Sequence, residues 1–523
     1  MTESHRPGDH LEPEDPESGF LTDQEPPAAD DSDAVGEDVL SQEQPGATVI
    51  RELPEFPPVR HDVDLSHLDR RPPPGAPREY HFPAFRRDAA RNGMTVIQAH
   101  LPGRPLLTAQ LLFDGGAAEE PPEQAGATVL AARALTEGTR RRDAIELVEA
   151  SERLGAELHA EAGWEALAAS VEVPRSRFGQ ALALLAEMVL EPSFPEPEVE
   201  RLRAERLNDL MQARADPRRR IERVFTETIY DAASPYSRPL AGTEATVPTI
   251  ERASLVKRHV ALLDPGRATF IVAGDLRDVD VLGLVDEHLG TWITERPSDR
   301  PALDDRPHPE APRVVIVDRP DSPQSELRVG HVGLPRRVPE FHAVSVLSSI
   351  LGGLFNSRLQ RLLREQRGYT YGVHAGFDLR RGAGPFAVRT AVETDATVPA
   401  IRDILAELER IRSAPVDDGE LAEARDYLVG VFPLRFEAAP QVVAAITSLV
   451  THELPDDELD RYRPSIAAVD AASVLDAARR HIRPSEASIV VIGDARRFEA
   501  ELRDADVGPL SIVAERETAA PTG

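Results

Sequence analysis

The sequence predicts an α+β protein built from two homologous halves. The segments RATFIVAGD (residues 267–275) and EASIVVIGD (residues 486–494) align without a gap, and each follows an amphipathic helix with a proline between. The predicted strands and helices also follow a shared order in the two halves, which is typical of an internal duplication. We therefore expect two similar units, each combining strands with helices.

Composition sets the predicted domain limits. The first 50 residues hold fourteen Asp or Glu against one Arg, and Phe20 is their only aromatic residue. Such a segment cannot bury enough apolar surface to fold. We predict a disordered acidic, Pro-rich tail over 1–76, an N-terminal half over 77–296, a linker rich in Pro, Asp and Arg over 297–313, a C-terminal half over 314–510 and a short tail over 511–523.

Charge and hydropathy exclude several classes of partner. The formal net charge is −30, so we expect no nucleic acid. The chain has no cysteine, which excludes disulfides and thiolate metal sites. No apolar run approaches the roughly 18 residues of a membrane span, and the first residues lack the features of a signal peptide. We therefore expect no membrane contact and a cytoplasmic location.

Hydrophobic periodicity predicts the elements of each half. In the first half, two strands over 94–100 and 106–113 are predicted to form a hairpin around Pro102 and Gly103. The other predicted elements of this half are helices over 126–137, 144–154, 178–190, 197–214 and 248–259 and strands over 156–162, 166–173 and 268–272. In the second half they are strands over 314–317, 327–332 and 488–492 and helices over 341–351, 397–413, 418–429 and 441–451.

The stretch LGGLFNSRLQRLLREQRGYTYGVHAGF (residues 351–377) is predicted to be a helix followed by a strand. Ser357, with Gln360 three residues later, has the spacing of a capping box. Gly368 suits the left-handed position that ends a helix, and residues 369–373 are predicted to form the strand. Arg364 near the helix end and Tyr371 on the strand would then point into one cleft, although a surface arginine and a half-buried tyrosine are the simpler interpretation.

This stretch resembles the second-half signature of the insulinase or pitrilysin family of zinc metallopeptidases, which includes the mitochondrial processing peptidases. The resemblance covers about residues 79–505. It implies two similar halves, each a mainly antiparallel sheet carrying helices, that form a clamshell around a cavity. It also implies that Arg364 and Tyr371 reach toward a peptide at a zinc site. Guanidinium offers fixed donors to a carbonyl, and a phenol can donate to an oxyanion.

The family's zinc motif, HxxEH followed by a distal glutamate, is degenerate in this chain. The segment EEPPEQAGATVLAARALTEGT keeps the acidic loop, Gly126 and the closing Gly-Thr, but the three functional positions are Val129, Ala132 and Arg133. The distal glutamate falls near Asp209. None of the 15 histidines has another histidine four residues away, so we expect no metal and no cofactor in this chain. His159 and His374 are interpreted as strand residues rather than ligands.

The resemblance also implies a peptide-docking edge at Glu157, Leu158, His159, Ala160 and Glu161. In the family, the corresponding edge strand pairs with extended substrate through main-chain hydrogen bonds. An ordinary internal strand is the alternative interpretation of this segment.

Three functions remain open from the sequence. The leading hypothesis is a non-catalytic subunit that is inactive alone. In a heterodimer with an HxxEH-bearing partner that holds the zinc, it would bind unstructured peptide and supply Arg364 and Tyr371 in trans. The second is a structural or peptide-binding scaffold with no role in proteolysis, and the third is an autonomous peptidase with an unrecognised site.

Deleting residues 1–75 should leave the melting temperature nearly unchanged, because the composition of this segment gives it no apolar face to pack on the body. Differential scanning calorimetry of the full and shortened chains measures this directly. A large drop in melting temperature would show that the tail packs on the folded part.

Overall fold

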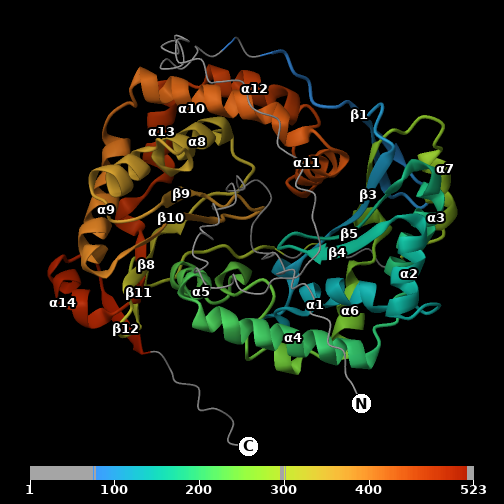
Figure 1. The fold of residues 1–523 in the computed structure, drawn as a ribbon, viewed down its shortest axis with the longest axis horizontal. Helices are drawn as coiled ribbons and strands as arrows, with labels where there is room; N and C mark the ends of the chain where they lie inside the picture. The colour runs from blue at the N-terminus through green and yellow to red at the C-terminus, as the bar shows by residue number, and fades with distance from the viewer. Residues whose placement is uncertain (1–74, 76–77, 295–299, 301, 515–523) are drawn as a thin grey trace, which may run out of the picture. The chain divides into compact units, whose positions relative to one another are not determined.

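The computed structural model describes residues 75, 78–294, 300 and 302–514. The acidic tail predicted over 1–76 lies outside these residues, apart from Gly75. From Tyr80 onward the described chain belongs to one compact unit. Its named strands form two six-stranded sheets, one in each predicted half, and helices pack on both sheets (Figure 1).

The first sheet has the strand order β1-β2-β6-β3-β5-β4. Its strands are β1 (Phe85–Ala89), β2 (Thr95–His100), β3 (Leu106–Asp114), β4 (Glu157–Ala162), β5 (Ala166–Pro174) and β6 (Ala268–Gly274). All neighbours are antiparallel except β2 and β6. The predicted hairpin of β2 and β3 is wrong, because β6 lies between them and pairs with both.

The second sheet has the order β12-β7-β11-β8-β10-β9. Its strands are β7 (Val314–Asp318), β8 (Gln324–Val332), β9 (Val373–Phe377), β10 (Pro385–Glu393), β11 (Ser488–Gly493) and β12 (Leu510–Ala514). Only the pairs β11–β7 and β12–β7 are parallel, so both sheets are mainly antiparallel as expected. The predicted tail from residue 511 starts too early, because β12 extends this sheet to residue 514.

The duplication predicted from the two closing segments is confirmed by the sheet topology. Strands β7, β11, β8, β10 and β9 occupy the places of β2, β6, β3, β5 and β4. The aspartates after β6 and β11 are held alike: Arg277 Nε donates to Asp275 and Arg496 Nε donates to Asp494, each at 2.9 Å. The first bond lowers the pKa of Asp275, and the second lowers the pKa of Asp494 to about 2.

The predicted helices are present. The α-helices are α1 (Ala127–Ala134), α2 (Ala144–Leu154), α3 (Phe178–Leu190), α4 (Glu196–Ala215), α5 (Pro217–Ile229), α6 (Arg252–Leu262), α7 (Val281–His288), α8 (Phe341–Ser348), α9 (Thr397–Ser413), α10 (Asp418–Val431), α11 (Ala439–Thr451), α12 (Glu458–Ala468), α13 (Ala471–His481) and α14 (Ala495–Asp504). Among the described residues, no single helix is long and apolar enough to cross a membrane; residues 418–436 and α11 meet the length and composition criteria only as a pair bent by 114°.

One helix from each half packs on the sheet of the other half. Ile221 and Phe225 of α5 lie in one apolar cluster with Val490 of β11 in the second sheet. Val442 and Ile446 of α11 form a cluster with strands β2, β3, β5 and β6 of the first sheet. Figure 1 shows α5 beside β8 and β11, and α11 beside β3. Both sheets are therefore covered on their second face by a helix from the other half.

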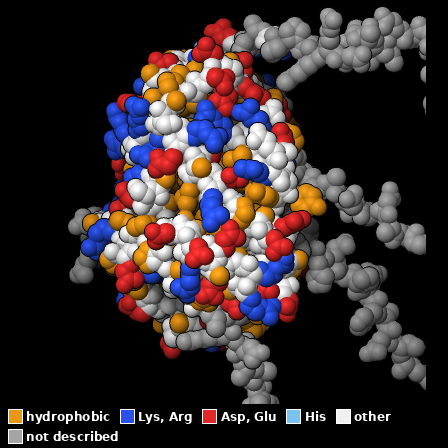
Figure 2. All heavy atoms as spheres, turned by 90° about the vertical axis from the view of Figure 1, so that its left-hand side faces the viewer, with side chains coloured by type: hydrophobic (Ala, Val, Ile, Leu, Met, Phe, Trp, Pro, Cys, Tyr) orange, Lys and Arg blue, Asp and Glu red, His pale blue; other side chains and the backbone are white. Residues whose placement is uncertain are grey.

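The face that carries α9 and α14 is polar (Figure 2). Acidic and basic side chains are interspersed on it, with apolar side chains between them. Arg402 of α9 pairs with Glu501 of α14 at 2.9 Å.

Phe225→Ala should destabilise the second sheet although the residue belongs to the first half. Truncating a buried phenylalanine costs about 3–5 kcal/mol. Hydrogen exchange of the amides in β8, β10 and β11 should accelerate more in this variant than in Phe178→Ala, a matched control buried within the first half. Equal exchange in the two variants would contradict the role assigned to α5.

Candidate functional site

Helix α1 carries the segment that resembles the family's zinc motif in sequence. It starts after Gly126, whose φ of 99° is left-handed, and the buried Glu120 accepts hydrogen bonds from the N–H groups of Gly126 and Thr128. Val129 and Ala132 are buried in the apolar core of the first half. The acidic loop therefore caps the helix, and two of the three motif positions serve packing.

Arg133, the third motif position, pairs with a glutamate on α4. Its Nη2 lies 3.2 Å from Glu205 Oε2, and both side chains are about two-fifths exposed. Glu205 also accepts a hydrogen bond from Arg201, whose guanidinium binds Glu137 at 2.6 Å as well. This ion-pair network, to which Glu198 also belongs through Arg201, thus joins α1, the turn after it and α4.

Asp209, the predicted counterpart of the distal glutamate, lies one helical turn beyond Glu205. Its carboxylate is 3.6 Å from Arg206 Nη1 on the same helix. The structure therefore brings Glu205, and not Asp209, to the degenerate motif. Residues four apart share a helix face, so the sequence indicated Asp209, although Glu205 one turn earlier makes the contact with Arg133.

Zinc does not fit these residues. Valine and alanine have no donor atom, and a guanidinium adds a fixed positive charge where a dication would bind. In the part of the chain that the structure describes, no group of three or more His, Asp or Glu side chains could hold a metal ion.

Strand β4, which carries the predicted docking residues, is the last strand of its sheet and not an internal one. Glu157, His159 and Glu161 are exposed, whereas Ala160 is buried. Glu161 lies 3.7 Å from His159 Nε2 and raises the pKa of that imidazole. The edge is therefore lined by acidic side chains and one histidine.

The register of β4 shows which main-chain groups are open. Gly163 N–H donates to Ala166 O at 2.8 Å, so this pair is hydrogen-bonded, and the pairing alternates along β4 and β5. By this alternation the N–H group of His159 points toward β5, whereas the N–H groups of Leu158 and Ala160 point away from β5. These are the groups that an added strand would use.

The stretch over residues 351–377 differs from its predicted geometry in three ways. The helix that carries Arg364 is π-helical over Gln360–Gln366. The predicted capping box is absent, because Ser357 Oγ and Gln360 Oε1 are buried without a hydrogen-bond partner among the described residues. The strand begins at Val373 rather than at residue 369. The left-handed Gly368 is confirmed, with a φ of 66°.

Arg364 lies on an aromatic ring. The centre of its guanidinium is 3.9 Å from the centroid of the Phe355 ring, and Nη2 lies 3.0 Å from Glu365 Oε1. Tyr371 is 93 % exposed. It belongs to a turn in which Gly372 O accepts hydrogen bonds from Thr370 Oγ1 and from Thr390 Oγ1. Among the described contacts none joins Arg364 to Tyr371, so the chain presents them as two separate groups.

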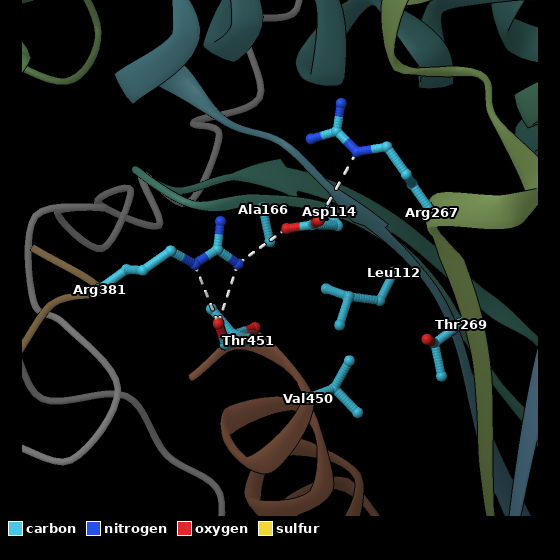
Figure 3. A pocket seen from close by; sticks show the side chains of 8 residues that line it. All are labelled: Leu112, Asp114, Ala166, Arg267, Thr269, Arg381, Val450 and Thr451. Carbon is cyan, nitrogen blue, oxygen red and sulfur yellow. Dashed lines mark hydrogen bonds and ion pairs between the residues drawn. The ribbon is translucent and has the colours of Figure 1, made fainter. Parts of the chain in front are cut away.

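A second polar cluster, which the sequence did not indicate, joins the two halves at Asp114 (Figure 3). The carboxylate binds Arg381 Nη2 at 2.7 Å and also pairs with Arg267 and Arg300. Burial would raise the pKa of Asp114, but the bonds and charges of Arg300 and Arg381 lower it. Arg381 also donates to Thr451 O at the end of α11. The Asp114 carboxylate of β3 therefore binds side chains from the predicted linker and from the second half.

The cavity beside Asp114 is too small for a peptide. It has a volume of about 20 Å³ and is lined by Leu112, Asp114, Ala166, Arg267, Thr269, Arg381, Val450 and Thr451. That volume has room for roughly one water molecule. We therefore assign the cluster to the joint between the halves.

Two family models match this chain. One, described as insulinase (peptidase family M16), covers residues 95–244, and the other, described as peptidase M16 inactive domain, covers residues 249–428. The chain belongs to the insulinase family of peptidases, M16.

Individual relatives agree with this assignment. The chain is 27% identical over 356 residues to an uncharacterized zinc protease of Mycobacterium tuberculosis, covering 68% of this chain and 81% of the relative. It is 22% identical to the non-peptidase homolog YmxG of Helicobacter pylori, covering 64% and 76%. Its fold matches the crystal structure of a peptidase M16 inactive domain from Pseudomonas fluorescens with a TM-score of 0.73 and 23% identity, covering 78% and 98%.

Removing the Arg133–Glu205 pair should cost little stability. Half-exposed ion pairs contribute about 0–1 kcal/mol, so a double-mutant cycle with Arg133→Met and Glu205→Gln should give a coupling energy in that range by urea unfolding. The Arg206–Asp209 pair on α4 serves as control. A coupling energy well above that of the control would mean that the pair replaces the metal as a structural link between α1 and α4.

Proposed function

We propose that this chain is a non-catalytic subunit of a heteromeric zinc peptidase. It binds unstructured peptide along β4 and supplies Arg364 and Tyr371 to the active site of an HxxEH-bearing partner. The observation that carries the proposal is that Val129 and Ala132 are built into the core while Tyr371 is exposed.

The two side chains have complementary roles in this proposal. The Arg364 guanidinium is always charged and donates in a fixed fork to a peptide carbonyl. The Tyr371 hydroxyl donates to the oxyanion that forms when that carbonyl is attacked. The attack itself belongs to the partner's metal site, because Val129, Ala132 and Arg133 of this chain can neither bind zinc nor take a proton from water.

Tyr371→Phe and Arg364→Lys should both reduce peptide turnover by the reconstituted two-chain complex. Losing one oxyanion donor costs about 100- to 1000-fold in turnover, and an ammonium does not reproduce the guanidinium fork. Neither change removes core volume, so both variants should assemble, which size-exclusion chromatography checks. Wild-type turnover by fully assembled variants would remove both residues from the chemistry.

Leu158→Pro should weaken binding of a fluorescent unstructured peptide without unfolding the chain, because it removes an N–H that points away from β5. His159→Pro is the matched control: it removes an N–H that bonds β5 and should lower the melting temperature. If Leu158→Pro is folded and binds the peptide with unchanged affinity, β4 is not the docking edge.

A scaffold with no role in proteolysis is the second candidate. It is favoured by the place of Arg364, which already stacks on Phe355 and pairs with Glu365 within this chain. In that case the Tyr371 and Arg364 variants should behave as wild type in every assay of turnover.

A further inference from the structure

Phe355 is an exposed aromatic residue outside the apolar clusters of the fold. Its side chain is 71 % exposed, and it belongs to no described core cluster. Its backbone oxygen lies 3.5 Å from Arg364 Nη2, and the guanidinium centre is 3.9 Å from its ring centroid. Core packing therefore does not account for an aromatic ring at this position, whereas its contact with Arg364 does.

The helix that carries Arg364 has an uncommon geometry. Residues Gln360–Gln366 are π-helical, and Arg367 N–H donates to Leu362 O, five residues back. π-helical turns are rare and are frequent at functional sites. The wider turn changes the direction in which Arg364 leaves the helix relative to an α-helix, and in this structure it lies over the Phe355 ring.

The contacts of Arg364 leave one edge of its guanidinium open. The bonds to Glu365 Oε1 and to Phe355 O both use Nη2. In the described chain Nε and Nη1 have no hydrogen-bond partner. A long side chain that is free to rotate loses rotamer freedom when a ligand fixes it. A ring and a carboxylate that hold it beforehand reduce that loss.

We infer that Phe355 is a positioning residue, which holds the Arg364 guanidinium by a cation–π contact so that its Nε and Nη1 edge faces the peptide. The inference rests on the proposed function, in which Arg364 binds a peptide carbonyl. Cation–π contacts at exposed sites are worth enough to change an occupancy roughly two- to five-fold. Trp has the most favourable ring for such a contact and Leu has none.

The test measures kcat and KM of the reconstituted two-chain complex for an internally quenched unstructured peptide. Phe355→Leu should lower kcat/KM about two- to five-fold relative to the wild type. Phe355→Trp, which keeps an aromatic ring, should have at least the wild-type kcat/KM. In the Arg364→Lys background, Phe355→Leu should have a smaller effect, because the two side chains act together. Leu434→Ala, which removes another exposed apolar side chain of the same half, should leave kcat/KM unchanged.

Arginine-selective ¹⁵N NMR of the chain alone gives a readout apart from activity. The Nε–H group of Arg364 should show restricted motion in the wild type and in Phe355→Trp, and conformational averaging in Phe355→Leu. If Arg364→Lys lowers turnover and Phe355→Leu alters neither turnover nor the motion of this group, the positioning role is wrong although the proposed function stands. If Arg364→Lys has no effect on turnover, the proposed function fails and the inference fails with it.

Discussion

Each sheet of this protein needs cover on both of its faces, and the rest of the structure depends on how that cover is supplied. The central strands β6 and β11 are buried at every position, as is typical of strands with apolar contacts on both sides. In each half, one face of the sheet is covered by helices of the same half. The other face is covered by α11 in the first sheet and by α5 in the second sheet. The halves are therefore coupled through their cores, and the Asp114 cluster adds a polar link at the same joint.

This exchange leaves β4 and β9 as the corresponding end strands of the two sheets. In the first half, β4 offers outward N–H groups beside α1. In the second half, β9 follows the turn that carries Tyr371. A chain of this family can therefore lose its metal ligands without losing its fold, because Val129 and Ala132 contribute to packing and Arg133 is neutralised by Glu205.

The sequence was most informative where a local rule determines the structure. The repeat of β6 and β11 and the left-handed Gly368 follow from residue type and spacing, and the structure has both. The predictions failed where contacts between segments far apart in the sequence determine the structure. Nothing near residues 94–113 indicates that β6, from residue 268 onward, separates β2 from β3. Glu205 and Asp209 lie on one helix face, and only the packing of α4 on α1 selects Glu205. The Asp114 cluster joins side chains from four separate segments, so no motif indicates it.

The chain keeps the fold of its family, whereas Val129, Ala132 and Arg133 cannot supply the metal chemistry of the HxxEH motif. The most direct test is metal analysis of the purified chain after dialysis against zinc, combined with mass spectrometry of an unstructured peptide incubated with it. We expect no stoichiometric zinc and an intact peptide, with or without a chelator. One tightly bound zinc per chain, together with peptide cleavage that a chelator abolishes, would contradict this account.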